Sequence, residues 1–461
     1  MIKLTNTLSG RKEELVPFKD RKVNMFVCGP TVYDYSHIGH ARTYIFFDVV
    51  AKYLRYLGYK VTYLMNITDI DDKIIDRAQK EGRGVKDVAK YYEKLFFKDI
   101  ENIKIDGVSK FARATDHIKE IIKQIKILVE KGYAYKINDG VYFDISKFAD
   151  YGKLAKRTVE QAEDGVSRID ESINKRNKGD FTLWKLSKPG EPKWPSPWGD
   201  GRPGWHIEDT AISEKYLGQQ YDIHGGSQDL IFPHHEAEIA QQESASGKKP
   251  FVKYWLHSGF LLTNGQKMSK SLGNFITIMD ILQHYSPQSV RMLALSNYYR
   301  SPVDYTEALI KQSQAAVNRI GEFVNKLELA NGKDREDVET HVSETRRQFT
   351  EAMDNDFNTP QAIAAIFELL KKMNLLLAEG SVSKKTAGKI KKMLKNFDSV
   401  LGIIPTKKEK VPNEVLELVE KREKLRKEKK WEEADKIRAQ IEEMGYRVDD
   451  TAYGPLVRLA V

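Results

Sequence analysis

A strand, a glycine–proline break, a helix and a second strand follow one another near the start of the chain, and this order constrains the fold most. Residues 22–28, KVNMFVC, are an apolar run that Gly29 and Pro30 interrupt. From His40 the segment ARTYIFFDVVAKYLRYLG repeats apolar residues at helical spacing, and KVTYLMNIT at 60–68 is typical of a second strand. Short connections between strand, helix and strand predict a parallel, doubly wound sheet and therefore an α/β fold.

The rest of the chain changes character several times. Residues 75–135 have mainly helical patterns, whereas 136–203 are rich in Pro, Gly and Trp and indicate an insertion. Near Trp205 the α/β pattern resumes, with a strand, a glycine turn and a helix from about Pro233. After Tyr299 long helical periods predict a bundle. We divide the chain into a sheet core in two halves at 1–115 and 204–300, an insertion at 116–203, a bundle at 301–404 and a small basic module at 405–461.

Composition excludes several classes of protein. The chain has 461 residues and 41% hydrophobic residues, enough for about three globular domains. Its one cysteine excludes an internal disulfide framework and fits a reducing cytoplasm. The N-terminal residues have no apolar h-region, and no run of about 18 apolar residues occurs, so we expect neither secretion nor membrane insertion.

Positive charge is concentrated near the C-terminus. Residues 381–461 hold 20 Lys and Arg against 14 Asp and Glu, a net +6 of the +9 for the whole chain. The block KREKLRKEKK at 421–430 contributes seven of these cations. Two interpretations stay open on charge alone: a solvated helical face, or a surface that contacts nucleic-acid phosphates.

A His-Ile-Gly-His motif, residues 37–40, opens the first predicted helix. A helix N-terminus offers free N–H groups and a positive dipole end, and Gly39 permits close approach of a phosphate. The imidazoles of His37 and His40 can donate hydrogen bonds to developing negative charge. Taken alone, the motif could equally be two capping or surface histidines.

A second motif, Lys-Met-Ser-Lys-Ser at 267–271, lies between Asn264-Gly265 and Gly273-Asn274. Two lysines, Lys267 and Lys270, in such a loop can neutralise a polyphosphate leaving group. The spacing is not that of a P-loop, and an ordinary basic turn is the alternative. The two motifs in this order form a strong signal of phosphate chemistry.

Four residues have the chemistry of a metal site: Cys28, Asp209, His234 and Glu238. His234 and Glu238 are four residues apart, so a helix places both on one face. Cys28 ends the first strand, where the carboxyl edge of a parallel sheet gathers ligands. Thiolate, imidazole and carboxylate together suit zinc, although a buried cysteine is more often a small apolar residue and an HHExE run a solvated helix. Seven of the ten histidines cluster at 37, 40, 206, 224, 234, 235 and 257, which favours the metal site.

With these motifs the sequence resembles the cysteinyl-tRNA synthetases, a class I family with a Rossmann catalytic core. The matching segments span nearly the whole chain in the family's order: FVCGPTVYDYSHIGHAR, NITDIDDKII, ARATDHI, GDFTLWK, GRPGWHIEDTAIS, IHGGSQDLIFPHHEAEIAQ, KMSKSLGNF, DNDFNTPQAI and WEEADKIRAQIEEMG. The combination of Cys28 with FPHHEAE is the most specific part, because the other two motifs occur in many class I synthetases.

The resemblance implies a two-step reaction. L-Cysteine and ATP, accompanied by Mg²⁺, would give cysteinyl-adenylate and pyrophosphate, and the cysteinyl group would then pass to the terminal adenosine of tRNA(Cys). His37, Gly39 and His40 would contact the ATP phosphates, Lys267 and Lys270 the pyrophosphate side, and Asp229 the nucleotide or the amino acid. The implied cysteine pocket contains Cys28, Gly29, Thr68 and Trp205. The bundle and the C-terminal module would bind the tRNA, with Trp431, Asp435 and Arg438 near the anticodon, and a cytoplasmic monomer is expected.

The resemblance also implies one Zn²⁺ per chain, bound by Cys28, Asp209, His234 and Glu238, which we call the metal set. A metal that binds the substrate thiolate would distinguish cysteine from serine by its preference for soft ligands, whereas shape alone gives about 1–3 kcal/mol of discrimination. The family usually has a second cysteine where this chain has Asp209. Bonds from zinc to oxygen, at about 2.0–2.2 Å, are shorter than those to sulfur, so ligation by Asp209 is feasible. We expect Asp209 to be a harder ligand; the alternative is that it misses the metal.

Two other functions fit the sequence less well. A decayed synthetase that only binds RNA should have lost phosphate-handling residues, yet both motifs are intact. A paralogous ligase that joins cysteine to a small amine would not need the roughly 160 residues that follow Tyr299.

Overall fold

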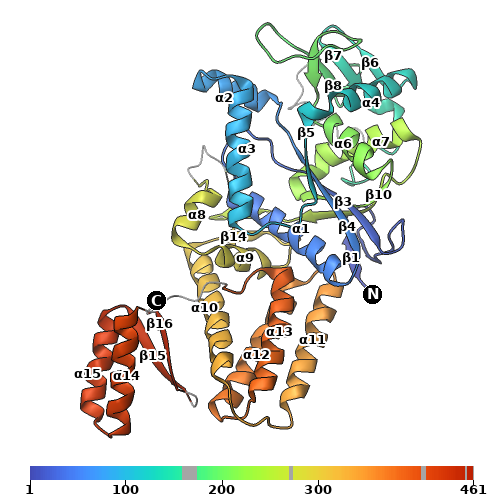
Figure 1. The fold of residues 1–461 in the computed structure, drawn as a ribbon. Coiled ribbons are helices and arrows are strands. Elements are labelled where there is room, and N and C mark those ends of the chain that lie inside the picture. The colour runs from blue at the N-terminus through green and yellow to red at the C-terminus, as the bar shows by residue number, and fades with distance from the viewer. Residues whose placement is uncertain (158–173, 269–273, 406–411, 452–453, 460–461) are drawn as a thin grey trace. The chain divides into compact units, whose positions relative to one another are not determined.

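The computed structural model describes residues 1–157, 174–268, 274–405, 412–451 and 454–459 (Figure 1). The chain forms two compact units. The first comprises Met1–Leu309 together with Asp354–Asn358, and the second comprises Ile310–Met353 and Thr359–Val461. The five-part division of the sequence is finer than these two units and stays a prediction.

A five-stranded parallel sheet is the centre of the first unit, in the order β11-β10-β3-β4-β5. Its strands are β3 (Lys22–Val27), β4 (Lys60–Ile67), β5 (Lys110–Arg113), β10 (Tyr221–Ser227) and β11 (Val252–Ser258). The sheet confirms the predicted α/β fold. Successive strands run outward from β3 in one direction through β4 and β5, and from β10 in the other direction to β11. The topological switch point therefore lies between β3 and β10, where ligands of open parallel sheets bind.

Helices connect and cover these strands. The first crossover helix, α1 (Ile38–Tyr56), packs along β4, β10 and β11, while α6 (Ile207–Leu217) packs across β3 and β4. The other helices in the described part of the first unit are α2 (Asp72–Glu81), α3 (Val85–Asn102), η1 (Ala114–His117), α4 (Ile118–Glu130), η2 (Ile145–Lys147), η3 (Gln228–Leu230), η4 (Ile231–His235), α7 (Glu236–Ser246), α8 (Ile278–His284) and α9 (Pro287–Leu295).

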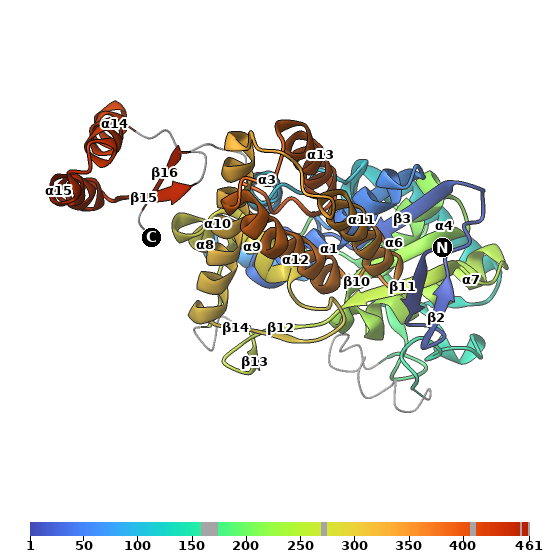
Figure 2. The same cartoon turned by 90° about the horizontal axis from the view of Figure 1, so that it is seen from below.

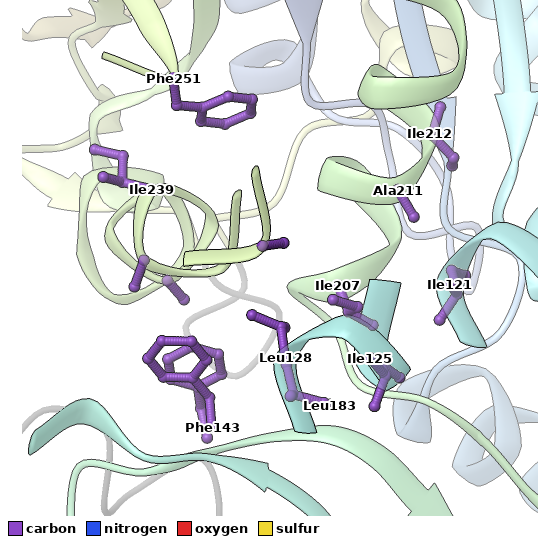
Figure 3. Packing of buried hydrophobic residues seen from close by; sticks show 14 of the residues in the cluster. Ile121, Ile125, Leu128, Phe143, Leu183, Ile207, Ala211, Ile212, Ile239 and Phe251 are labelled. Carbon is purple, nitrogen blue, oxygen red and sulfur yellow. The ribbon is translucent and has the colours of Figure 1, made fainter. Parts of the chain in front are cut away.

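The predicted insertion contains an antiparallel sheet in the order β6-β7-β8-β9. Its strands are β6 (Ala134–Lys136), β7 (Gly140–Phe143), β8 (Phe181–Leu186) and β9 (Gly201–Pro203). Figure 3 shows that Phe143 and Leu183 of this sheet pack with Leu128 of α4 and Ile207 of α6. Because the cluster also includes Cys28, the insertion and the parallel sheet share one hydrophobic core. This shared core fixes the position of the chain segments around Cys28.

Two small sheets complete the first unit. One is the N-terminal hairpin of β1 (Lys3–Asn6) and β2 (Arg11–Glu14). The other has the order β13-β12-β14, with β12 (Leu261–Thr263), β13 (Gln266–Lys267) and β14 (Val303–Tyr305) (Figure 2). The hairpin β12–β13 leads directly into the second sequence motif.

The second unit is helical, as the sequence predicts for residues after Tyr299. Four helices lie in its first part: α10 (Glu307–Leu329, which begins in the first unit), α11 (Val338–Asp354), α12 (Thr359–Ala378) and α13 (Lys384–Leu401). Farther along the chain, α14 (Asn413–Lys427) packs against α15 (Trp431–Glu443), and a hairpin of β15 (Tyr446–Thr451) and β16 (Gly454–Leu459) follows. Val415, Val419, Ile437, Ile441 and Val448 form the apolar core of this C-terminal part.

Several details differ from the sequence expectations. The strand β5 lies inside a region that we predicted to be mainly helical, because its four residues, KFAR, are too short and mixed to show alternation. The helix that we predicted from about Pro233 begins at Glu236 as α7. Pro233 itself lies in the π-helical turn η4, just before it. Across the described ranges, no helix combines the length and apolar character needed to cross a membrane.

Candidate active site and metal centre

Cys28 lies at the switch point of the parallel sheet, as the sequence predicts. It follows β3 directly, and its backbone N–H donates to the carbonyl of Gly225 in β10, at 3.1 Å. The side chain is buried. An added Cβ at the next residue, Gly29, would come within 1.8 Å of the Asn66 carbonyl oxygen, so only glycine lets β3 continue beside β4 at this point.

The four predicted metal ligands meet in one buried cluster. The Cys28 sulfur lies 3.4 Å from Asp209 Oδ2 and 3.8 Å from Glu238 Oε1. His234 Nε2 lies 3.0 Å from Asp209 Oδ2 and 3.2 Å from Glu238 Oε1. Ligand atoms about 2.0–2.3 Å from a tetrahedral zinc lie roughly 3.3–3.8 Å from one another, close to these separations. The donor set therefore fits a zinc ion in spacing and in chemistry.

A second set of possible ligands shares two members with the first. His224 Nε2 and His235 Nε2 lie 3.4 Å and 3.1 Å from the Cys28 sulfur. His224 Nε2 also lies 3.5 Å from Glu238 Oε2. Cys28 and Glu238 are thus between two pairs of side chains, Asp209 with His234 and His224 with His235. The histidine cluster is visible in the sequence, but we assigned neither His224 nor His235. His235, three residues before Glu238, competes with His234 for the same helical face, and His224 in β10 has no helical spacing to a predicted ligand.

Further polar side chains orient the cluster. Asn66 Nδ2 donates to Asp209 Oδ1 at 2.6 Å, which leaves Oδ2 to face His234 and Cys28. The Nδ1 atoms of His206 and His234 are 2.8 Å apart. On the other side, His235 Nδ1 is 2.8 Å from His257 Nε2, and the hydroxyl of Tyr221 is 2.6 Å from His224 Nδ1. Such partners fix the ring orientation of metal-binding histidines.

Electrostatics of the cluster favour a cation. Burial, with help from Asp209 and Glu238, raises the pKa of the Cys28 thiol well above its usual value. Burial and the neighbouring Asp209 likewise raise the pKa of Glu238. Among the described residues, no group donates a hydrogen bond to the buried Glu238 Oε2. Burial lowers the pKa of His224 and His235, so both imidazoles are neutral and supply no compensating charge. A divalent cation would stabilise the anionic forms.

The predicted phosphate site forms at the start of α1. His37 is the N-cap of this helix, and its Nδ1 accepts from the Gly39 N–H at 3.0 Å. His40 Nδ1 faces the N–H of His37 at 3.4 Å, and the two rings stack with centroids 3.9 Å apart. Burial lowers the pKa of His40 to about 4, with Asp229 opposing that effect. His40 is therefore neutral at pH 7.

The described start of the second motif lies beside the first motif. Backbone hydrogen bonds join Ile38 N–H to the Ile276 carbonyl, at 3.1 Å, and Ile278 N–H to the Ser36 carbonyl, at 2.9 Å. An added Cβ on Gly39 would lie 3.1 Å from Cε of Met268. The second motif therefore begins beside the helix N-terminus of the first. Residues 269–273, with the predicted Lys270, lie outside the described residues, and Lys267 is placed only by its backbone in β13.

Sequence comparisons identify the family. Residues 14–315 match the model of the class I (C) tRNA synthetase catalytic domain, 348–405 the DALR domain, and 408–454 the cysteinyl-tRNA ligase anticodon binding domain. The cysteine–tRNA ligase of Thermococcus gammatolerans is 46% identical over 98% of both chains. That of Thermoplasma volcanium is 48% identical over 96% of this chain and 97% of its own. The chain belongs to the cysteine–tRNA ligase family.

Solved structures agree on the fold of this cysteine–tRNA ligase family member. A methionyl-tRNA synthetase of Mycobacterium tuberculosis, 17% identical, covers 83% of this chain and 90% of its own, with a TM-score of 0.63. A leucyl-tRNA synthetase of Agrobacterium radiobacter, 11% identical, covers 85% of both chains with a TM-score of 0.62. At these identities the likeness concerns the fold alone.

Other residues that the family resemblance implies lie near the cluster. Trp205 stacks on His234, with ring centroids 4.4 Å apart and planes inclined by 24°. The Thr68 hydroxyl donates to Glu208, a buried carboxyl that sequence reasoning did not single out. Asp229 is exposed in η3, directly after β10. The structure therefore brings Trp205 to the metal set.

The three residues expected near the anticodon are on one helix. Trp431, Asp435 and Arg438 of α15 are spaced four and three residues apart, so they share a helical face. Trp431 is 56% exposed, and the guanidinium of Arg426 lies over its ring, 5.7 Å from the centroid. An exposed tryptophan beside arginines can stack on an unpaired base.

Proposed function

We propose that this chain is a cysteine–tRNA ligase, which activates L-cysteine with ATP and transfers the cysteinyl group to the terminal adenosine of tRNA(Cys). The observation that carries this proposal is the buried cluster of Cys28, Asp209, His234 and Glu238 at the switch point of the sheet. It lies in the same unit as the phosphate motif at the start of α1. Similarity to named cysteine–tRNA ligases over nearly the full length supports the assignment.

These four side chains would hold one Zn²⁺. When bound, zinc would supply a soft Lewis acid that takes the thiolate of cysteine in preference to the hydroxyl of serine. The residues themselves contribute shape and orientation: Asn66 directs one oxygen of Asp209 toward the cluster, and Trp205 covers the ring of His234. Gly29 and Thr68 would complete the amino-acid pocket.

His37 and His40 would contact the ATP phosphates during adenylation. In each ring Nδ1 faces a backbone N–H, so each neutral imidazole carries its proton on Nε2. An Nε2–H group is a hydrogen-bond donor to a phosphate oxygen. Donors held by backbone contacts need little reorganisation when charge develops, which stabilises the transition state.

Lys267 and Lys270 would neutralise pyrophosphate as it leaves, with Mg²⁺ bound to ATP. Support comes from the backbone hydrogen bonds that join Ile276 and Ile278, which follow the motif, to Ile38 and Ser36 at the start of α1. Met268, within the motif, lies beside Gly39. Asp229 would face the nucleotide or the amino acid, since its charge acts on the His40 imidazole.

The transfer step requires the tRNA. Trp431, Asp435 and Arg438 would contact the anticodon, and the basic residues 421–430 would contact phosphates. The match of 408–454 to a cysteinyl-tRNA ligase anticodon binding domain supports this assignment. We further propose a cytoplasmic monomer.

The test is charging of a tRNA(Cys) transcript by the full chain with radiolabelled cysteine, ATP and Mg²⁺. We expect acid-precipitable label that depends on all three, and none with a tRNA(Ser) transcript. Absence of charging, together with absence of cysteine-dependent ATP–pyrophosphate exchange, would refute the proposal.

A further inference from the structure

A five-residue segment joins two helices of the second unit but packs into the first. Asp354–Asn358 runs from the last residue of α11 to the residue before α12, yet it groups with the catalytic sheet. Its backbone is held there, because Asp356 N–H donates to the Lys3 carbonyl at 2.7 Å. Asp356 and Phe357 have φ values of +65° and +50°, a left-handed conformation that non-glycine residues rarely adopt. Two such residues in succession cost free energy that the contacts of the segment must offset.

The carboxylate of Asp356 is fully buried and accepts four hydrogen bonds. Thr5 donates from its backbone N–H at 2.7 Å and also from its hydroxyl. The hydroxyl of Tyr298 donates to Oδ2, and that of Tyr299 donates to Oδ1 at 3.1 Å. Each carboxylate oxygen thus accepts two hydrogen bonds, and the hydroxyl groups of both tyrosines are held in place.

The backbone of the same two tyrosines helps to hold a buried arginine. Arg42, only 2% exposed, lies two residues after His40 in the first turns of α1. Its guanidinium donates to five backbone carbonyls, those of Gly259 at 2.7 Å, Phe260 at 2.6 Å, Tyr298 at 3.4 Å, Tyr299 at 3.3 Å and Ser301. These hydrogen bonds connect the start of α1 to the backbone just before β12, the strand that leads into the second motif.

Aromatic packing reinforces the link between the segment and α1. Phe46, one helical turn after Arg42, stacks on Tyr299 with ring centroids 3.9 Å apart. Phe357 meets the edges of Phe46 and Tyr53, with centroids 6.4 Å and 6.3 Å away. The segment therefore contacts the motif-bearing helix directly and through the two tyrosines.

We propose that Asp356 is a positioning residue for adenylation, which acts through Tyr298, Tyr299 and Arg42 on the histidines at the start of α1. The proposal rests on the phosphate-binding role of these histidines under the proposed function. Misplacement of reacting groups by about 1 Å can reduce a rate about a hundredfold, so a chain of hydrogen bonds that fixes this helix affects catalysis without touching substrate.

The test is the steady-state rate of cysteine-dependent ATP–pyrophosphate exchange in Asp356→Asn and Tyr298→Phe. Asn keeps the acceptor Oδ1 and nearly the same volume, and Phe removes only the hydroxyl. We expect kcat to fall about tenfold or more in Asp356→Asn, with the KM for cysteine changed less than about twofold and zinc content unchanged. The double variant should lose little beyond Asp356→Asn alone, because both changes remove the same hydrogen bond from the Tyr298 hydroxyl to Oδ2 of Asp356.

Asp354→Asn is the matched control. Asp354 belongs to the same segment and accepts from the Tyr53 hydroxyl at 2.7 Å, but it contacts neither tyrosine that holds Arg42. It should keep kcat within about twofold of the unmodified chain. An unchanged kcat in Asp356→Asn, or an equal loss in Asp354→Asn, would overturn the proposal. Exchange by the unmodified chain is measured first, so that failure of the proposed function is recognised separately.

Discussion

Asn66 donates from Nδ2 to Oδ1 of Asp209 at 2.6 Å, and this contact orients the carboxylate that we propose as a metal ligand. One carboxylate oxygen is satisfied by the amide, while the other faces the sulfur of Cys28 and the imidazole of His234. Asp209 is 1% exposed, so its orientation depends on such partners rather than on water. These contacts support our proposal that Asp209 is a metal ligand.

Replacing Asp209 by alanine should weaken zinc binding at least about tenfold, because one of four donors is lost. Zinc per chain after dialysis against a weak chelator, measured by mass spectrometry, checks this. Asp209→Cys is the matched control and should keep about one zinc per chain. Equal zinc retention by Asp209→Ala and the unmodified chain would remove Asp209 from the ligand set.

His40→Asn should reduce ATP–pyrophosphate exchange about 10²–10³-fold through kcat, since a donor to developing phosphate charge is lost. The KM for cysteine should change little, because the metal set is intact. His341 in α11 offers a control: it pairs with Asp337, and His341→Asn should leave exchange near that of the unmodified chain. A rise in KM for cysteine with unchanged kcat would place His40 in the amino-acid pocket instead.

We expect Asp99 to make the stability of the fold depend on pH. Burial raises the pKa of this carboxyl in α3 to about 6, while Lys98 opposes the shift. Because the folded pKa lies above the unfolded value near 3.9, the stability that the protonated form contributes is complete below about pH 4. It is lost as the pH rises through 6, at a cost of up to about 3 kcal/mol by pH 8.

Asp99→Asn should therefore raise the midpoint of thermal unfolding clearly at pH 8 and much less at pH 5. The exposed Glu101, on the same helix, supplies the control, since Glu101→Gln should change the midpoint by a similar small amount at both values. A stabilisation by Asp99→Asn that is the same at pH 5 and pH 8 would show that the carboxyl is not perturbed.

Gly29→Ala should destabilise the catalytic unit and disturb the metal set. Its Cβ would meet the backbone oxygen of Asn66 at 1.8 Å, so the end of β4 must move, and with it the amide that orients Asp209. We expect a loss of about 2–4 kcal/mol, as for severe strain in a core, and weaker zinc binding.

Gly388→Ala provides the contrast to Gly29→Ala. An added Cβ at Gly388, in the second turn of α13, would meet nothing within 4 Å, and the change should stabilise its helix by up to about 1 kcal/mol. Thermal unfolding and zinc content of the two variants test both expectations. Normal stability of Gly29→Ala would mean that β3 and β4 can separate at this point without cost.

Much of the fold could be predicted from local pattern. The run from 22 to 28, the helix after the His-Ile-Gly-His motif and the strand from 60 gave the parallel sheet, because each was long and strongly periodic. The strand β5 could not be found, since four mixed residues carry no alternation. Its place is decided by pairing with β4, a tertiary contact that no local pattern records.

Only some of the site residues could be predicted from their spacing in the sequence. His234 and Glu238 were found because they are four residues apart, and Cys28 because it ends a strand. Asn66, Glu208, His224 and His235 converge on the same point from different elements, so their roles depend on the sheet order. Asp356 could not be predicted either, because its carboxylate accepts a hydrogen bond from Thr5, more than 300 residues earlier in the sequence.

The most direct test of the central claim is ATP–pyrophosphate exchange with cysteine and with serine, before and after removal of zinc by a chelator. The account predicts exchange with cysteine, none above background with serine, and loss of the cysteine signal on chelation that added zinc restores. Exchange that survives complete zinc removal with its selectivity for cysteine intact would contradict the account, because the pocket itself would then discriminate sulfur from oxygen.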